Sequence, residues 1–130
     1  MSRNVLVIES NELLVRMYQS IFQAMQCSVA HAATIGEALQ LLPGIRADLI
    51  ILDARLADDA SLEAVRLLRA QLEASDIPVI AMVSRPLSTD PNGMLDSRYQ
   101  SIVTKPFQVS VFAALARRKL GLNSATMSAT

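Results

Sequence analysis

Five short apolar segments are spaced along the chain, and polar segments with a different periodicity separate them. The central one, Leu49 to Leu52, does not alternate between polar and apolar residues, and a carboxylate closes it on each side, Asp48 and Asp53. A strand without alternation is buried on both faces, as strands of parallel sheets are. The pattern therefore predicts a buried parallel strand, with Asp53 at the point where the chain leaves the core.

The other four strands are predicted from apolar runs rich in β-branched residues. They span Asn4–Ile8, Cys27–Ala32, Pro78–Val83 and Ser101–Thr104. The second of these is interrupted by Ser28 and His31, which is typical of a strand at the edge of a sheet. We therefore expect His31 to be a solvated edge residue rather than a base or a metal ligand.

Apolar residues at helical spacing occupy the segments between these strands. The predicted helices run from about Asn11 to Met25, Thr34 to Leu42, Ser61 to Ala74 and Val109 to Leu120. Ser10 is predicted to cap the first helix, and Thr34 with Glu37 has the form of a capping box for the second. The dipeptide Pro43–Gly44 should end that second helix.

The same spacing predicts which side chains point into the core. The inward residues of the first helix are expected to be Leu14, Met17 or Tyr18, Ile21 and Met25, and those of the last helix Val111, Phe112 and Leu115. Polar composition predicts loops over Ala54–Ala60 and Ser84–Gly93. Met94–Tyr99 has only a weak helical signal.

Strands that alternate with helices at this spacing predict an α/β fold, a doubly wound five-stranded parallel sheet with helices on both faces. Right-handed crossovers and the strand order 2-1-3-4-5 place the first and third strands side by side. Ligands of such sheets bind outside the carboxyl ends of the strands, where the strand order reverses. The fold therefore predicts where a functional site should lie.

Composition narrows the function classes. A length of 130 residues with 52% hydrophobic content predicts one packed domain, residues 1–122, followed by a flexible C-terminal tail, 123–130. Twelve acidic and twelve basic residues give no broad charged surface for nucleic acid or membranes. The single Cys27 excludes an internal disulfide and a thiolate cluster and suggests a buried hydrophobe. Without a signal peptide or membrane-length apolar run, the expected location is cytoplasmic.

Polar residues follow four of the predicted strands. Glu9, Asp53, Ser84 and Lys105 come just after strands one, three, four and five. Because the carboxyl ends of parallel strands share one edge, these groups should meet in one crevice. A carboxylate nucleophile, a lysine that neutralises a phosphoryl group, a second carboxylate for a divalent cation and a hydroxyl together suit phosphoryl transfer.

Plainer interpretations stay open for the individual residues. Asp53 can act only as a hydrogen-bond acceptor for the turn that follows it. Lys105 with Pro106 can simply open a turn before a helix. The convergence of several groups at one edge favours the chemical interpretation over each of these.

The motifs at Val5–Glu9, Asp48–Asp53, Ile77–Ile80 and Thr104–Phe107 resemble, in this order and spacing, the receiver domain of two-component response regulators. The resemblance covers about Asn4 to Leu122. It implies a flavodoxin-like fold, a phosphoryl group accepted on Asp53 from a histidine kinase or phosphotransfer protein, and contact of Lys105 with that group. It also implies Mg²⁺ held by Glu9, Asp53 and the backbone carbonyl of Arg55, and a cis peptide bond between Lys105 and Pro106.

Several positions depart from the receiver pattern. Ser10 replaces the second of two adjacent acids, and the residues aligned with the switch hydroxyl and the switch aromatic are Val83 and Ile102. Ser84 lies one place after the hydroxyl position, and alternate residues of a strand face opposite sides, so it need not reach the site. Ala57 and Ser61 replace the usual Pro and Gly of the loop after the phosphoacceptor.

Two arginines border the expected pocket. We hypothesise that Arg55 or Arg85 pairs with Glu9 or Asp53 and partly replaces the charge of the metal. The alternative is that both guanidinium groups point to solvent, where an ion pair contributes little.

Three functions are compatible with these residues. The first is a stand-alone receiver, not an enzyme, that docks to a protein target. A homodimer is also compatible with this function. The second is a pseudo-receiver that binds through the helix 4–strand 5–helix 5 face without phosphorylation, helix 4 being the segment around Met94–Tyr99. The third, an aspartyl-nucleophile phosphatase, is disfavoured because Arg55 stands where such enzymes typically need a second acid.

Overall fold

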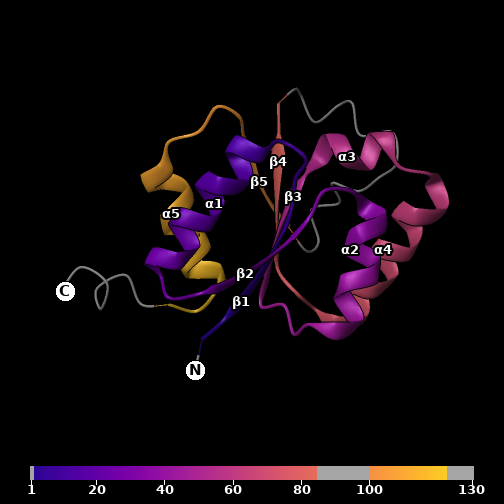
Figure 1. The fold of residues 1–130 in the computed structure, drawn as a ribbon, viewed down its shortest axis with the longest axis horizontal. Helices are drawn as coiled ribbons and strands as arrows, with labels where there is room; N and C mark the ends of the chain where they lie inside the picture. Colours follow the sequence, from indigo (N-terminus) through magenta and orange to yellow (C-terminus); the bar gives the residue numbers. More distant parts are fainter. Residues whose placement is uncertain (1, 85–99, 123–130) are drawn as a thin grey trace.

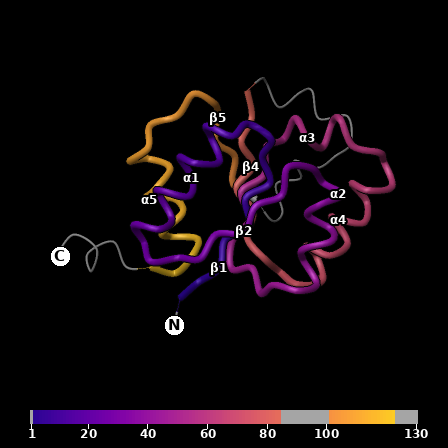
Figure 2. The backbone as a smooth tube through the Cα atoms, viewed as in Figure 1, coloured from indigo at the N-terminus to yellow at the C-terminus, as the bar shows by residue number. Residues whose placement is uncertain are grey.

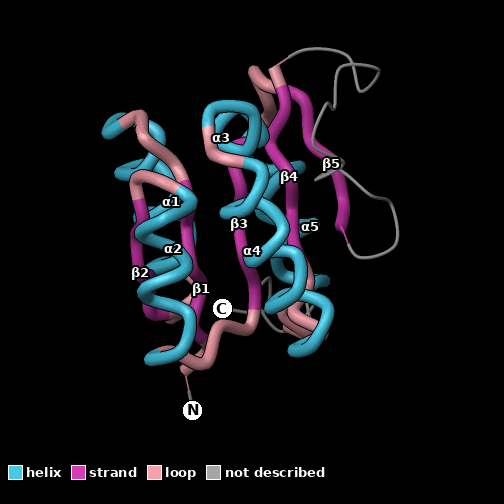
Figure 3. The backbone as a smooth tube through the Cα atoms, turned by 90° about the vertical axis from the view of Figure 1, so that its right-hand side faces the viewer, coloured by secondary structure: helices cyan, strands magenta, loops and turns pink. Residues whose placement is uncertain are grey.

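The computed structural model describes residues 2–84 and 100–122, and its centre is a five-stranded parallel sheet in the order β2-β1-β3-β4-β5. The strands are β1 (Asn4–Ile8), β2 (Ser28–Ala32), β3 (Leu49–Asp53), β4 (Val79–Val83) and β5 (Gln100–Thr104). Figure 3 shows them side by side in this order. The predicted α/β fold class and strand order are confirmed.

Helices cover both faces of the sheet (Figures 1 and 2). The helical elements are α1 (Glu12–Ala24), α2 (Ile35–Leu41), the 3₁₀ turn η1 (Leu42–Gly44), α3 (Ala54–Asp59), α4 (Leu62–Ser75) and α5 (Val109–Lys119). One face carries α1 and α5, and the other carries α2 and α4. Alternate strand residues serve the two layers: Val5 and Val7 pack toward α1 and α5, whereas Leu6 and Ile8 pack toward α2 and α4.

The central strand is buried as its composition predicts. Leu49, Ile50, Ile51 and Leu52 are fully inaccessible to solvent, and they divide between the two core layers. Strand β2 lies at the sheet edge, also as predicted. The sheet therefore delivers the residue after each strand to one common edge of the molecule.

The first helix begins one residue later than predicted. Asn11, not Ser10, is the N-cap of α1, because its Oδ1 accepts hydrogen bonds from the amides of Leu13 at 2.9 Å and Leu14 at 3.3 Å. The buried face agrees with the prediction at Tyr18 and Met25. Val15 and Phe22 are buried in place of the predicted Leu14 and Ile21, which flank the core.

The capping box of the second helix is confirmed in part. The amide of Glu37 donates to Thr34 Oγ1 at 3.1 Å, as predicted, whereas Glu37 Oε1 accepts the amide of Ala33, one residue before the N-cap, at 2.9 Å. The predicted start of α4 is also confirmed, since Ser61 Oγ accepts from the amide of Ala64 at 3.1 Å. Short polar side chains thus define where both helices of this layer begin.

The predicted loop over Ala54–Ala60 is wrong, because the structure has the short helix α3 over Ala54–Asp59. Asp53 is its N-cap and accepts the amide of Arg55. Its first residues are strong helix formers, and Ala57 is 2% exposed against the core. The polar residues Asp58 and Asp59 at its end drew the prediction toward a loop.

The inward face of α5 also differs from the prediction. Val111 is 61% exposed, whereas its neighbour Phe112 is fully buried together with Ala116. Consecutive residues of a helix point about 100° apart, and here Phe112 rather than Val111 faces the sheet. The predicted loop over Ser84–Gly93, apart from Ser84, the segment Met94–Tyr99 and the tail over 123–130 lie outside the described residues.

Cys27 is buried, as predicted for a small hydrophobe. Its burial raises the pKa of the thiol above its ordinary value, and the nearby Arg3 opposes that shift. The thiolate is therefore disfavoured, which suits a packing role. Within residues 2–84 and 100–122, no helix has the length and apolar character needed to cross a membrane.

We predict that Phe112→Ala lowers the free energy of unfolding by about 3–5 kcal/mol, because it empties a fully buried site. The adjacent, exposed Val111→Ala is the matched control and should change stability by less than about 0.5 kcal/mol. Urea unfolding followed by circular dichroism measures both. Equal losses for the two variants would contradict the observed orientation of α5.

Candidate functional site

Two buried carboxylates lie side by side at the carboxyl edge of the sheet. Glu9 follows β1 and Asp53 ends β3, and these strands are neighbours with Ile8 opposite Leu52. Glu9 is 1% exposed and Asp53 is 4% exposed, and they are the only buried side chains with an acidic or basic group among the described residues. Burying two negative charges together is costly unless positive groups compensate them.

Lys105 supplies the first compensating charge from the end of β5. Its Nζ donates to Glu9 Oε1 at 3.0 Å and lies 3.6 Å from Asp53 Oδ1. The side chain is 18% exposed, so the ion pairs are largely shielded from water. The amide of Lys105 donates to the carbonyl of Val83 at 2.7 Å, and the expected cis bond to Pro106 is present.

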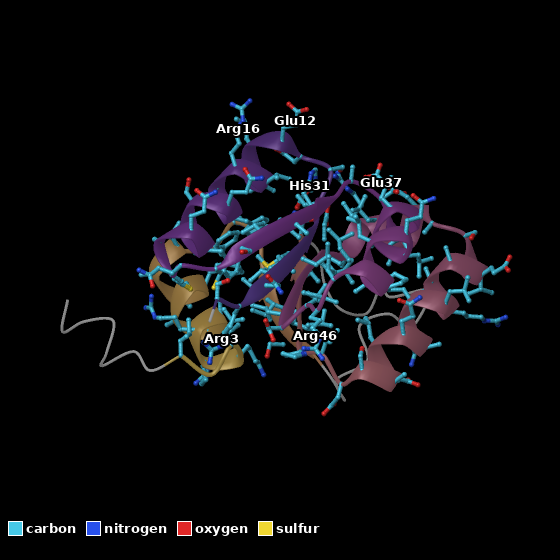
Figure 4. The ribbon with its side chains drawn as sticks, turned by 60° about the horizontal axis from the view of Figure 1, so that its bottom comes forward. Arg3, Glu12, Arg16, His31, Glu37 and Arg46 are labelled. Carbon is cyan, nitrogen blue, oxygen red and sulfur yellow. The ribbon has the colours of Figure 1, made fainter. Side chains whose placement is uncertain are left out.

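Groups at this edge of the sheet contact both the side chain and the backbone of Glu9. Its Oε2 accepts from the amide of Asn11 at 3.0 Å, and its own amide donates to the carbonyl of Ala32 at 3.0 Å. His31 is exposed on the edge strand, as predicted, and its Nε2 lies 2.8 Å from the carbonyl oxygen of Glu9. Figure 4 shows His31 at the same end of the strands as Glu12 and Glu37, whereas Arg3 and Arg46 lie at the opposite end.

Arg55 supplies the second compensating charge. Its Nη2 lies 3.7 Å from Asp53 Oδ2, and its side chain is 60% exposed at the mouth of the site. The hypothesis that Arg55 pairs with Asp53 is therefore supported, while Arg85 lies outside the described residues. Asp53 Oδ1 accepts the amide of Arg55 at 3.2 Å, but Asp53 Oδ2 is buried and accepts no hydrogen bond from residues 2–84 or 100–122.

Tyr18 is a neighbour of the site that the sequence pattern indicated only as a possible core residue. Its ring is fully buried, stacked on Phe107 with centroids 6.1 Å apart and tilted against Phe112 at 5.4 Å. Its hydroxyl has no hydrogen-bond partner in the described part of the chain. Burial, assisted by the negative charges of Glu9 and Asp53, raises the pKa of this hydroxyl, so Tyr18 stays neutral.

The predicted hydroxyl does not join this group. Ser84 is exposed beyond the end of β4, and no hydrogen bond links it to the carboxylates or to Lys105 in the described part of the structure. Val83, at the aligned position, is 5% exposed and carries no polar atom on its side chain. Ile102, at the position of the switch aromatic, is half-buried on β5.

The donors around Asp53 do not fit a divalent cation as they are arranged. Of the four carboxylate oxygens of Glu9 and Asp53, three already accept hydrogen bonds. The backbone carbonyl of Arg55, expected as a metal ligand, lies in the first turn of α3, where helical geometry directs it away from Asp53. Within the described residues, no group of three or more His, Cys, Asp or Glu side chains is suitably placed.

A family model described as the response regulator receiver domain matches residues 5–117. Among curated proteins, the polar-differentiation response regulator DivK of Brucella anthropi is 27% identical over 121 residues, which is 93% of this chain and 98% of that protein. The DivK of Brucella ovis is 26% identical with the same coverage. The chain therefore resembles relatives of nearly its own length.

Solved structures share the fold. One is the receiver domain of the sensor histidine kinase PA1611 from Pseudomonas aeruginosa PAO1, a structure with a magnesium ion coordinated in its active-site cleft. It has a TM-score of 0.76 and 23% identity, and the match covers 93% of this chain and 99% of that one. The REC domain of the PhyR response regulator from Erythrobacter litoralis has a TM-score of 0.73 and 27% identity, with coverage of 92% and 90%.

We predict that Lys105→Met lowers the free energy of unfolding by about 3 kcal/mol, because Glu9 loses its buried partner. Adding Glu9→Gln to that variant should restore part of the loss, since the uncompensated charge is removed. Urea unfolding of the two single variants and the double variant measures this coupling. If the two single effects simply add, the ion pair does not exist in solution.

Proposed function

Since the chain belongs to the response regulator receiver domain family, a signalling module of two-component systems, we propose that Asp53 accepts a phosphoryl group. The donor is a histidine kinase or a phosphotransfer protein, the partners with which receiver domains interact. The observation that carries the proposal is the buried Asp53, with Lys105 Nζ 3.6 Å from its Oδ1 and an Oδ2 that accepts no hydrogen bond within the described part of the chain.

In the proposed reaction, Asp53 Oδ2 attacks the phosphorus of a phosphohistidine. The new O–P bond forms as the P–N bond breaks, and the imidazole, which carries a proton on its other ring nitrogen, leaves as a neutral ring with the bonding electron pair. Lys105 remains protonated and pairs with the oxygens of the phosphoryl group, whose spread negative charge it stabilises. Glu9 positions Lys105 through the 3.0 Å contact and holds its charge close to Asp53.

Magnesium is the cofactor that the family resemblance implies, and one structural relative holds it in its cleft. In this chain Glu9 and Asp53 are the carboxylates available to it, and Ser10 stands where a further acid is expected. Because the arranged donors do not fit the ion, no step of the proposed reaction passes through a metal.

We further propose that the domain acts alone in the cytoplasm and transmits its state by protein contact, without binding nucleic acid or membranes directly. Its alignment over 98% of a response regulator of similar length supports a single receiver domain as the working unit. The described part of the expected docking face, β5 and α5, exposes Val109 at 48% and Val111 at 61%. A downstream protein or a second copy of the chain could bind these apolar side chains.

A second candidate is a pseudo-receiver that binds its partner without phosphorylation. The observation that favours it is that Val83 and Ile102 occupy the usual switch positions, which therefore carry no hydroxyl and no aromatic ring. The nearest hydroxyl in the sequence, that of Ser84, is exposed. In this alternative, the ion pairs of Asp53 serve only stability.

The two candidates differ in whether Asp53 is modified. We predict that phosphoramidate adds one phosphoryl group to the protein and none to Asp53→Asn, as measured by intact-protein mass spectrometry. Asp59→Asn is the matched control, because Asp59 is exposed at the far end of α3 and should be labelled like the wild type. An unlabelled wild type at high donor concentration would favour the pseudo-receiver.

A further inference from the structure

We propose that Lys105 and Arg55 together supply the positive charge that a divalent cation would bring, so that this site does not bind Mg²⁺. The inference deepens the proposed function, on which its chemical part rests. It follows from four features of the site: the charge balance, the occupied oxygens, the direction of one carbonyl and the exposure of one guanidinium.

Among the described residues, two cations balance the two buried carboxylates of the site without a metal. The carboxylates of Glu9 and Asp53 face the cations of Lys105 and Arg55, with contacts of 3.0, 3.6 and 3.7 Å joining the four groups. Attraction between charges is strong where both carboxylates are at least 96% shielded from water, as their exposures of 1% and 4% show. A divalent ion placed here would meet two cations and gain little from carboxylates that are already paired.

Most of the carboxylate oxygens that could bind a metal already accept hydrogen bonds. Lys105 occupies Glu9 Oε1, the amide of Asn11 occupies Glu9 Oε2 and the amide of Arg55 occupies Asp53 Oδ1. Mg²⁺ prefers six oxygen ligands in near-octahedral geometry and is usually bound through one or two carboxylates. Of the four carboxylate oxygens only Asp53 Oδ2 accepts no hydrogen bond from the described residues, and it is the atom that attacks phosphorus in the proposed reaction.

Helix α3 directs the remaining expected ligand, the backbone carbonyl of Arg55, away from the site. Its first turn starts directly after Asp53, so the carbonyl of Arg55 points along the helix toward the amide four residues on. The same turn places the side chain of Arg55 back over Asp53, with Nη2 3.7 Å from Oδ2. The backbone therefore turns a potential metal ligand away and brings a cation to the same position.

Arg55 suits the phosphoryl group that would arrive. A guanidinium is always charged and presents parallel N–H donors that match phosphate oxygens, and at 60% exposure this one can move from Oδ2 to the incoming group. As the O–P bond forms and the P–N bond of the donor breaks, the added negative charge lies between Arg55 and Lys105. Both cations keep their protons throughout.

The direct test is a Mg²⁺ titration followed by amide chemical shifts of Asn11, Ala54 and Arg55 in ¹⁵N-labelled protein. We expect no saturable shifts in the wild type. The variant Ser10→Asp with Arg55→Met restores a second acid and removes a cation, and it should bind Mg²⁺ at least about tenfold more tightly than the wild type. Saturation of the wild type as tight as that of the double variant would overturn the proposal.

The rate of phosphorylation by phosphoramidate tests the same inference. With phosphoramidate and a chelator, the wild type should be labelled as fast as with Mg²⁺, and Arg55→Met should be about 100-fold slower without the metal. Arg46→Met is the matched control, because Arg46 is exposed at the opposite edge of the sheet (Figure 4). Labelling of the wild type that requires Mg²⁺ would refute the inference and leave the proposed function standing.

The two proposals fail in different ways. If the wild type is not labelled with or without Mg²⁺, the phosphoacceptor function is refuted, and the chemical-shift titration still decides whether the site takes the metal. Since Ser10 and Arg55 are both exposed, their replacement should leave the core intact, and the amide spectrum of each variant verifies this directly.

Discussion

The ion pair between Lys105 and Glu9 is the contact on which the carboxyl edge of this sheet depends. The parallel topology brings the ends of β1 and β3 together, and with them two carboxylates that water hardly reaches. Such a pair is tolerated only where cations are fixed beside it. Lys105 reaches both carboxylates from β5, and this contact links the first, third and fifth strands at one point.

Much of the fold follows from the sequence because hydrophobic patterns are strong signals in parallel α/β proteins. The uninterrupted run Leu49–Leu52 identifies the central strand, and the residues after each strand identify the edge where Glu9, Asp53 and Lys105 meet. These are consequences of burial and topology, which many residues determine together. The capping of α2 and α4 was equally predictable, because Thr34 and Ser61 act through hydrogen bonds within a few residues.

The errors lie where neighbouring residues offer nearly equal choices. Ser10 and Asn11 can both cap a helix, and only the path of the backbone into α1 selects Asn11. Val111 and Phe112 are both apolar, so packing against Tyr18 decides which is buried. Helix α3 was missed because its polar end resembles a loop. Because of this helix, Arg55 places its guanidinium beside Asp53, whereas the prediction was that its backbone carbonyl would bind a metal.

The central claim is that this carboxylate pair is neutralised by protein cations rather than by a metal. A crystal structure of the wild type from crystals soaked in magnesium, refined at a resolution that distinguishes ion from water by coordination geometry, tests it most directly. The account predicts Lys105 Nζ on Glu9, Arg55 beside Asp53 and no octahedral ion at Asp53 Oδ2. An octahedrally coordinated ion bound to that oxygen, with Arg55 displaced into solvent, would contradict it.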